Sequence, residues 1–416
     1  MKKILNFFKI KNYKALFTTG AGVGISQLIS LMSIPIIARL SGPEIFGKYS
    51  FYNSIIIVLC VFGSLKMEYV LYRIPWRLYP HLKLISFWLI LINSIALSFL
   101  SFLSLFFLSE ILNVDVFYSF AISIASTCLF QFTIQDNIKK NKYKKNAYMR
   151  IFRSFLIPLT YFCIVFFGET TPVHILISYS IGNIIPWVLM QSTKDFRKIK
   201  FKRIKSKNIK SMWRICYPVT MYLVPAHFLN RYSVGCLLII SGLYGIKSQD
   251  LAIYSIVEKL IVVPAGIITT AVSDVVKSEI NKNPMNGLKN YYKISIYTIL
   301  LSIVTILIVV NFSEYLIVYL MGSKWFGVGE FTVAILPYFV SLLVFGPITH
   351  TYTILNKQKY DFVWQIFNSI LITVAVLLGL NSDFLTSVHY FSISASISLL
   401  ISATICRYII VSMPDK

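Results

Sequence analysis

Residues 17 to 47 read "FTTGAGVGISQLISLMSIPIIARLSGPEIFG". No charged residue occurs between Phe17 and Ala38, and a helix of that length crosses a hydrocarbon core of about 30 Å at about 1.5 Å per residue. The apolar pattern resumes after Gly47. We therefore expect two membrane-spanning helices joined by a tight turn in the segment "GPEIFGKY", Gly42 to Tyr49.

Similar apolar runs recur along the whole chain. Of the 416 residues, 56% are hydrophobic and 13% are charged, and the mean hydropathy is +0.71. This composition is far more apolar than that of a soluble domain. We predict an all-α polytopic membrane protein with about twelve transmembrane helices. The predicted spans are 16–39, 46–65, 84–108, 116–135, 152–168, 172–190, 213–242, 251–272, 294–311, 331–355, 362–380 and 387–406.

Basic residues predict the orientation of these spans. The net charge is +24, from 40 Lys and Arg against 16 Asp and Glu. With the N-terminus in the cytoplasm, all but six of the basic residues fall in the N-terminal tail, the cytoplasmic connections and the C-terminus. The exceptions are Arg39, Lys48, Lys247, Lys324, Arg231 and Lys259. By the positive-inside rule both termini are cytoplasmic, and the basic loops are expected to attract anionic lipid headgroups rather than nucleic acid.

The most basic stretch, residues 192–214, predicts a division into two lobes of six helices. We expect an N-terminal lobe at 1–191, a cytoplasmic linker at 192–214 and a C-terminal lobe at 215–416. A weak repeat agrees with this division, because Tyr49-Ser50 and Tyr254-Ser255 each follow an acidic residue about half the chain apart. Residues 312–330 form the longest predicted outer connection, too short for a soluble domain.

No catalytic or metal motif emerges from the sequence. "GPEIFGKY" resembles a P-loop but has Tyr49 where Mg²⁺ needs Ser or Thr. The five histidines lack metal-ligand spacing, the six cysteines lie in apolar runs without CxxC pairs, and acids such as Glu314 are expected in outer loops. We predict no metal, no nucleotide and no cofactor, and a transporter rather than an enzyme.

Three charges lie inside predicted spans: Arg231, Glu258 and Lys259. Intramembrane charges normally face a polar cavity or a partner. Arg231 and Glu258 have similar predicted depths on adjacent spans, so one reading is a structural ion pair between them. The other reading is that Arg231 lines a cavity for an anionic substrate and Glu258 couples transport to a proton or cation gradient. Lys259, as the next residue, is expected to face elsewhere.

Residues around Arg231 form a polar stripe at helical spacing, in which Tyr217, Thr220 and His227 are candidate substrate-binding residues. Pro35, Pro218 and Pro225 interrupt the helical hydrogen-bond ladder and are candidate hinges. Span 1 carries small residues at helical spacing, which fit close helix packing as well as a cavity lining. They are Thr19, Gly22, Ser26, Ser30 and Ser33.

The segments "ISQLISLMSIPIIARLSGPEIFGKYS" (25–50) and "SLKMEYVLYRIP" (64–75) resemble the polysaccharide transporter family, the Wzx-type O-antigen flippases of the multidrug/oligosaccharidyl-lipid/polysaccharide exporter superfamily. The matching positions are Pro35, Arg39, Pro43-Glu44, Phe46-Gly47 and Glu68. Residues 228–260 are also similar to the family. The chain departs from it at Asn230, where members often have an acid.

The resemblance implies two six-helix lobes around a central cavity, in the bacterial inner membrane. It implies alternating-access transport of an undecaprenyl-pyrophosphate-linked oligosaccharide, such as an O-antigen or capsule repeat unit. Arg231, His227, Arg39, Tyr217 and Thr220 are the expected substrate contacts, because guanidinium groups bind pyrophosphate by several hydrogen bonds. Polysaccharide polymerase and chain-length proteins are candidate partners. The alternatives are a polymerase or ligase and a drug/cation exporter of the same superfamily.

Overall fold

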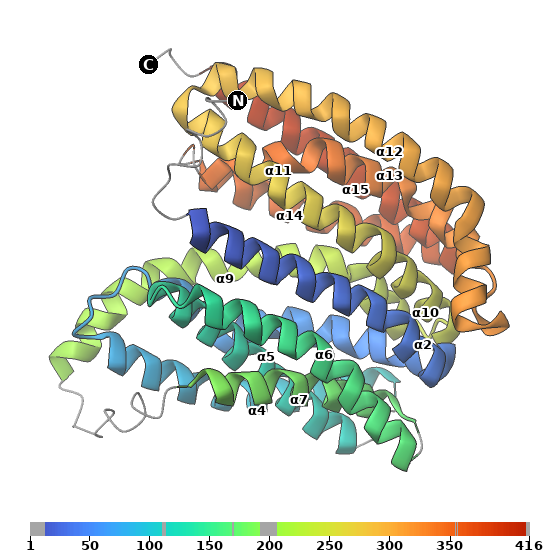
Figure 1. Ribbon diagram of the computed structural model, residues 1–416, viewed down its shortest axis with the longest axis horizontal. Helices are drawn as coiled ribbons and strands as arrows, with labels where there is room; N and C mark the ends of the chain where they lie inside the picture. The colour runs from blue at the N-terminus through green and yellow to red at the C-terminus, as the bar shows by residue number, and fades with distance from the viewer. Residues whose placement is uncertain are drawn as a thin grey trace. The chain divides into compact units, whose positions relative to one another are not determined.

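The computed structural model describes residues 13–109, 114–168, 170–191, 206–353, 355 and 357–412. All regular secondary structure in these ranges is helical (Figure 1). The long helices are α2 (Tyr13–Ser64), α4 (Tyr79–Ser109), α5 (Val114–Lys139), α6 (Tyr143–Phe167), α7 (Pro172–Met190), α9 (Ser206–Leu243), α11 (Val263–Lys282), α12 (Pro284–Met321), α13 (Val328–Thr349), α14 (Gln358–Leu380) and α15 (Phe384–Val411). Shorter elements are α3 (Met67–Val70), α10 (Ser248–Val257), the π-helical η1 (Glu258–Val262) and the 3₁₀ turns η2 (Ser323–Trp325) and η3 (His350–Thr353).

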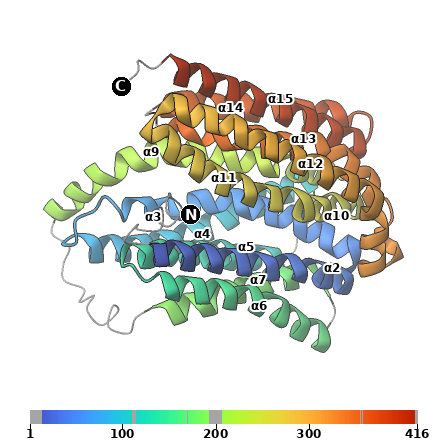
Figure 2. The same cartoon turned by 45° about the horizontal axis from the view of Figure 1, so that its top comes forward.

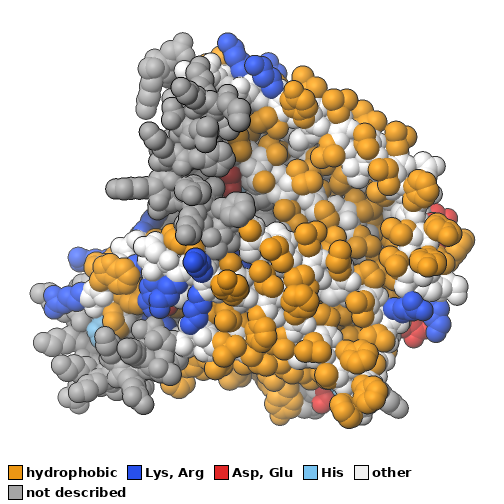
Figure 3. Space-filling view, in the orientation of Figure 1, with side chains coloured by type: hydrophobic (Ala, Val, Ile, Leu, Met, Phe, Trp, Pro, Cys, Tyr) orange, Lys and Arg blue, Asp and Glu red, His pale blue; other side chains and the backbone are white. Residues whose placement is uncertain are grey.

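The predicted fold class, an all-α polytopic membrane protein with about twelve transmembrane helices, is confirmed. Eleven helical stretches in the described ranges are long and apolar enough to cross a membrane. The first of them, Gly20–Ser64, has 45 residues and is broken at Gly42, whose φ of 73° is favourable only for glycine. It therefore makes two crossings, and the turn predicted after span 1 is confirmed. Figure 3 shows apolar side chains spread over the displayed face, with Lys and Arg gathered near its margins.

Helix starts carry the residues that satisfy free backbone amides. Thr171, Asn283 and Asp383 precede α7, α12 and α15, and each side chain accepts a hydrogen bond from the backbone N–H three residues later. Pro172 and Pro284 occupy the first turn, where a missing N–H costs nothing. These polar caps fix where the apolar helices begin.

The chain divides into two compact units. Unit 1 comprises residues 1–41 and 55–228, and unit 2 comprises residues 42–54 and 229–416. The boundary between the large parts lies within α9, between Phe228 and Leu229. The basic linker predicted at 192–214 lies largely outside the described residues, so its role and the predicted lobe limits stay predictions.

Unit 1 contains the first part of α2 with α4, α5, α6 and α7, which lie side by side (Figures 1 and 2). Small residues allow its helices to approach closely. A Cβ at Gly22 would collide with Ala147 of α6, and a Cβ at Gly182 would collide with Ile157. The close-packing reading of span 1 is therefore confirmed at Gly22, as expected for membrane helices.

Unit 2 contains α10 to α15 and the short segment 42–54 of α2. The segment packs against α10 through Gly47, where a Cβ would collide with the Ser248 carbonyl group. It packs against η2 through Phe46, whose ring meets that of Trp325 edge-on at 5.9 Å between centroids. These contacts explain why a stretch so early in the chain belongs to the C-terminal unit.

The outer loop predicted at 312–330 is wrong in its first half, because α12 continues to Met321. Glu314 lies in this helix rather than in a loop. Its carboxylate accepts hydrogen bonds from the backbone amides of Gly327, at 2.7 Å, and Gly329. Glu314 thereby stabilises the turn that follows the helix. This role could not be predicted from the charge of the residue alone.

Candidate functional site

Arg231 lies on the exposed face of α9, a continuous helix of 38 residues. Two residues later Ser233 points the opposite way and hydrogen-bonds Ser369 of α14 at 2.9 Å. Tyr232 contacts the same helix through Thr373 at 3.1 Å. Since two helical residues subtend about 200°, Arg231 projects away from α14. An exposed guanidinium on a membrane-spanning helix requires water or an anion beside it.

The ion pair predicted between Arg231 and Glu258 is wrong. The ion pairs of the described residues do not include one between these side chains. The ion pairs of the described residues do not join Glu258 to Lys259 either, so the expectation that these neighbours face apart stays a prediction. The helical rise predicted that Arg231 and Glu258 lie at similar depth. The direction in which each side chain projects depends instead on the rotation of about 100° per residue around the helix axis.

The backbone hydrogen-bond pattern of the helix changes at η1, the π-helical turn Glu258–Val262 between α10 and α11. Here the Val263 amide donates to the Glu258 carbonyl, five residues back, instead of four. Pro264 follows in the first turn of α11 and lacks an amide to donate. A π turn inserts one residue into the helical register and occurs often at functional sites. Glu258 and Lys259 are the first two residues of this turn.

Lys259 occupies a polar and aromatic cage made within unit 2. Its ammonium donates to Ser255 Oγ at 2.7 Å and to Ser50 Oγ at 3.4 Å. It also lies 4.7 Å from the ring centroid of Phe46 and 5.3 Å from that of Tyr49, within cation–π range. These two serines are the serines of the Tyr-Ser repeat noted in the sequence. Both copies of the repeat therefore contact the same Lys259 ammonium.

The other predicted site residues lie in unit 1. His227 is partly buried and its ring stacks on Tyr69 at 5.6 Å between centroids. Thr220 donates to carbonyl groups of its own helix, and Tyr217 and Arg39 are exposed. Because Arg231 belongs to unit 2 and these four residues to unit 1, their convergence on one cavity stays a prediction.

The predicted hinges also stay predictions. Pro35 and Pro225 lie within α2 and α9, and Pro218 lies in α9 with its side chain outside the described part. The non-helical residue of α2 is Gly42 and not Pro35.

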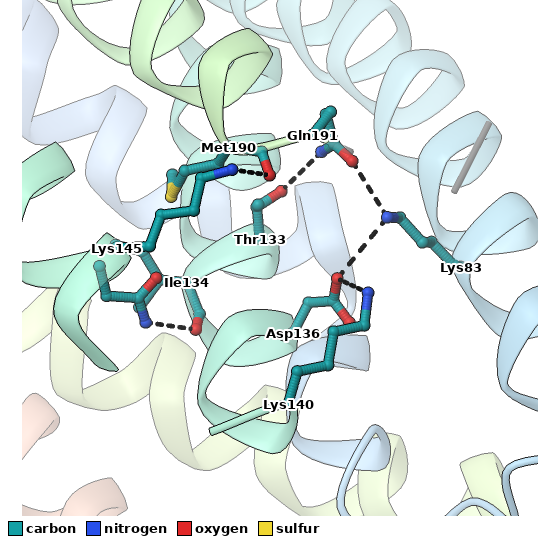
Figure 4. A network of polar contacts seen from close by, with 9 residues as sticks. Lys83, Thr133, Ile134, Asp136, Lys140, Lys145, Met190 and Gln191 are labelled. Carbon is teal, nitrogen blue, oxygen red and sulfur yellow. Dashed lines mark hydrogen bonds and ion pairs between the residues drawn. The ribbon is translucent and has the colours of Figure 1, made fainter. Parts of the chain in front are cut away.

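A buried polar network in unit 1 was missed (Figure 4). Asp136 on α5, 3% exposed, shares one carboxylate oxygen between Lys140, at 3.0 Å, and Lys83 of α4, at 3.6 Å. Lys83 also donates to Gln191 at the end of α7 at 3.0 Å, and Gln191 donates to Thr133 at 3.1 Å. The predicted fourth span ended at residue 135, so Asp136 and Lys140 fell outside it and were not considered as site residues.

Comparison with known proteins assigns the family. The family model described as "Polysaccharide biosynthesis protein" matches residues 36–329. The chain belongs to this polysaccharide biosynthesis protein family. The match contains α9, with Arg231, and η1, with the Lys259 cage. No curated protein sequence matches the chain.

Solved structures share the fold. "Lipid II flippase MurJ, inward closed conformation" matches with a TM-score of 0.70 and 14% identity, over 95% of this chain and 88% of that one. An inward-facing multidrug resistance MATE family transporter of the MOP superfamily matches with a TM-score of 0.59 and 12% identity, over 95% and 94%. A further MOP superfamily transporter, from Pyrococcus furiosus, matches with a TM-score of 0.53 and 11% identity, over 95% and 94%. The chain has the fold of MOP superfamily transporters.

Proposed function

We propose that the protein is a flippase that moves an undecaprenyl-pyrophosphate-linked oligosaccharide, such as an O-antigen or capsule repeat unit, across the bacterial inner membrane. The observation that carries the proposal is Arg231, an exposed guanidinium on a membrane-spanning helix of a polysaccharide biosynthesis protein. Pyrophosphate offers many acceptor oxygens and matches the planar donor fork of arginine. Membership of the family and the flippase-like fold support a lipid-linked glycan as substrate.

In this mechanism the lipid-linked pyrophosphate is the partner of Arg231, and Glu258 is not. His227 and Arg39 supply further donors to the phosphates, and Tyr217 and Thr220 line the path. Glu258 and Lys259 sit in the π turn as the coupling pair for a proton or cation gradient. Both termini lie in the cytoplasm, as the distribution of basic residues favours. No step in this cycle makes or breaks a covalent bond, so the protein acts as a transporter and not as an enzyme.

The test is surface glycan in a deletion strain complemented at matched protein level. Arg231→Ala is expected to abolish export, and Arg231→Lys to retain part of it, because lysine keeps the charge but not the planar fork. Arg407→Ala is the matched control, since Arg407 is exposed at the end of α15 beside Tyr292. Full export by Arg231→Ala would remove this residue from the mechanism.

Coupling is tested separately with reconstituted protein. Glu258→Gln keeps the shape of the side chain and removes its charge. We expect substrate binding to persist while the dependence of transport on an imposed proton or sodium gradient is lost. An unchanged gradient dependence would assign Glu258 a structural role only.

The MATE-like fold keeps drug/cation export as a second candidate function. A drug exporter would raise the minimal inhibitory concentration of cationic drugs in a sensitive strain, independently of glycan genes. A flippase would restore surface glycan and leave drug resistance unchanged.

A further inference from the structure

A short folded segment, residues 65–78, joins α2 to α4 within unit 1. It contains α3 (Figure 2) and lies between two candidate membrane spans, Gly20–Ser64 and Tyr79–Leu103. Four of its apolar side chains are at most 8% exposed: Val70, Leu71, Ile74 and Leu78. Its outer surface is made of exposed aromatic and basic side chains, which are Tyr72, Arg73, Trp76 and Arg77. The segment is therefore amphipathic and lies at the edge of the membrane.

Contacts with α5 hold the backbone of this segment. Leu65 and Lys66 begin it with φ angles of 46° and 55°, a left-handed conformation that is uncommon for residues other than glycine. Lys139 of α5 donates hydrogen bonds to the carbonyl groups of Leu71 and Ile74, the second at 3.0 Å. These carbonyl groups therefore point toward α5 and not toward the outer surface. A disfavoured backbone persists only where its surroundings determine it, so the outer surface has a defined shape.

The outer surface is positively charged. The one acid of the segment, Glu68, is 5% exposed in its side chain and pairs with Lys66 at 3.6 Å, so it does not neutralise the exposed arginines. The ion pairs of the described residues do not include Arg73 or Arg77. Four residues of chain span at most about 14 Å. Because arginine side chains are long, both guanidinium groups can reach the same ligand.

Two neighbouring guanidinium groups suit a ligand with two adjacent phosphates. Each guanidinium presents a planar fork of donors that matches phosphate oxygens. A pyrophosphate between a lipid and a sugar carries two negative charges, which balance the two arginines, whereas the phosphodiester of a common phospholipid carries one. Tyr72 and Trp76 are 50% and 62% exposed, and such side chains are typical of the headgroup level of a bilayer. The phosphates of a lipid-linked pyrophosphate lie at that level.

We propose that the outer surface of residues 65–78 is an entry site, where the protein first binds the pyrophosphate of its lipid-linked substrate in the cytoplasmic leaflet. Arg73 and Arg77 each bind one phosphate, and Trp76 lies at the membrane surface beside them. The inference rests on the proposed function and on the predicted cytoplasmic side of this segment. It adds a binding site that belongs wholly to unit 1 and does not include Arg231.

The test is equilibrium binding of radiolabelled undecaprenyl pyrophosphate to the full-length purified protein in neutral detergent. Every sample carries Arg231→Ala, which removes the proposed transport contact. Because one cation near the membrane surface contributes about fivefold in affinity, Arg73→Gln/Arg77→Gln should weaken binding about 25-fold. Arg73→Lys/Arg77→Lys should retain part of the affinity, since lysine keeps the charge but not the fork. Arg407→Gln is the matched control and should bind as the Arg231→Ala protein does, because Arg407 is an exposed arginine beside an aromatic ring on α15.

Equal affinities of the Arg231→Ala protein and its double glutamine variant would overturn the inference. They would leave the proposed function standing, because that function is tested by the export of glycan by Arg231→Ala. A competition with phosphatidylglycerol decides the kind of phosphate and needs no substitution in the segment, so it holds even if the glutamine variant fails to fold. Undecaprenyl pyrophosphate should stay bound in the presence of an equimolar amount of phosphatidylglycerol. Its displacement would indicate a general site for lipid phosphate and would overturn the inference.

Discussion

Gly47 is the position at which a single methyl group should separate α2 from α10. An alanine Cβ there would lie 2.6 Å from the carbonyl carbon of Ser248 and still closer to its oxygen. Carbon atoms in contact prefer about 3.5–4.0 Å, so the two backbones must move apart by roughly 1 Å. Overpacking costs about 1–3 kcal/mol, and the upper end applies because backbone cannot rotate away. Alanine regains about 1 kcal/mol of helix propensity, which leaves a net destabilisation of about 2 kcal/mol.

The matched control is Gly266→Ala on α11, where an added Cβ meets nothing within 4 Å. This variant should be unchanged or more stable by about 0.5–1 kcal/mol. The assay is thermal unfolding in detergent, followed with a fluorogenic thiol reagent, since five of the six cysteines are buried and only Cys163 is exposed. If Gly47→Ala unfolds at the wild-type temperature, the helices do not approach as described.

Three further changes test the charged and capping residues by the same unfolding assay. Lys259→Met should destabilise by about 1–3 kcal/mol, because Ser255 and Ser50 lose their hydrogen bonds to the ammonium and the rings of Phe46 and Tyr49 lose their cation. Asp136→Asn should cost several times more than Asp274→Asn, since the first carboxylate is buried between two lysines and the second is exposed. Asp383→Ala should cost about 0.5–2 kcal/mol at neutral pH. The hydrogen bonds that Asp383 accepts lower its pKa below 3.8, so its contribution is present above that pH and is lost as the pH falls through the lowered pKa.

The twelve crossings followed from the sequence because hydrophobic length is a one-dimensional property. A run such as that from Phe17 to Ala38 spans the bilayer whatever its neighbours are. The turn at Gly42 was predicted for a similar reason, since local residue chemistry selects it. The extension of α12 past residue 311 was not predicted, because a charged residue such as Glu314 lowers the local hydropathy and was interpreted as part of a loop. In the structure Glu314 stays in the helix, and its carboxylate accepts hydrogen bonds from the turn that follows.

The site was predicted less well because it depends on direction. Arg231 and Glu258 both lie in helices long and apolar enough to cross a membrane, but a count of helical residues gives the depth of a side chain and not the direction in which it projects. The aromatic cage around Lys259 depends on contacts between residues about two hundred positions apart. In the sequence the cage was indicated only by the weak Tyr-Ser repeat. The repeat was interpreted as a sign of two similar halves and not as two serines that contact the same lysine.

The division of α2 and α9 between the units has a consequence for how the chain is assembled. A cut in the basic stretch after residue 191 would leave residues 42–54 of unit 2 on the first fragment and residues 206–228 of unit 1 on the second. Each fragment would carry a piece that the other needs. In the second fragment alone, Lys259 would lose Ser50, Phe46 and Tyr49 and keep only Ser255. The two halves are thus reciprocal complements, and neither is a self-sufficient folding module that can be exchanged intact between proteins.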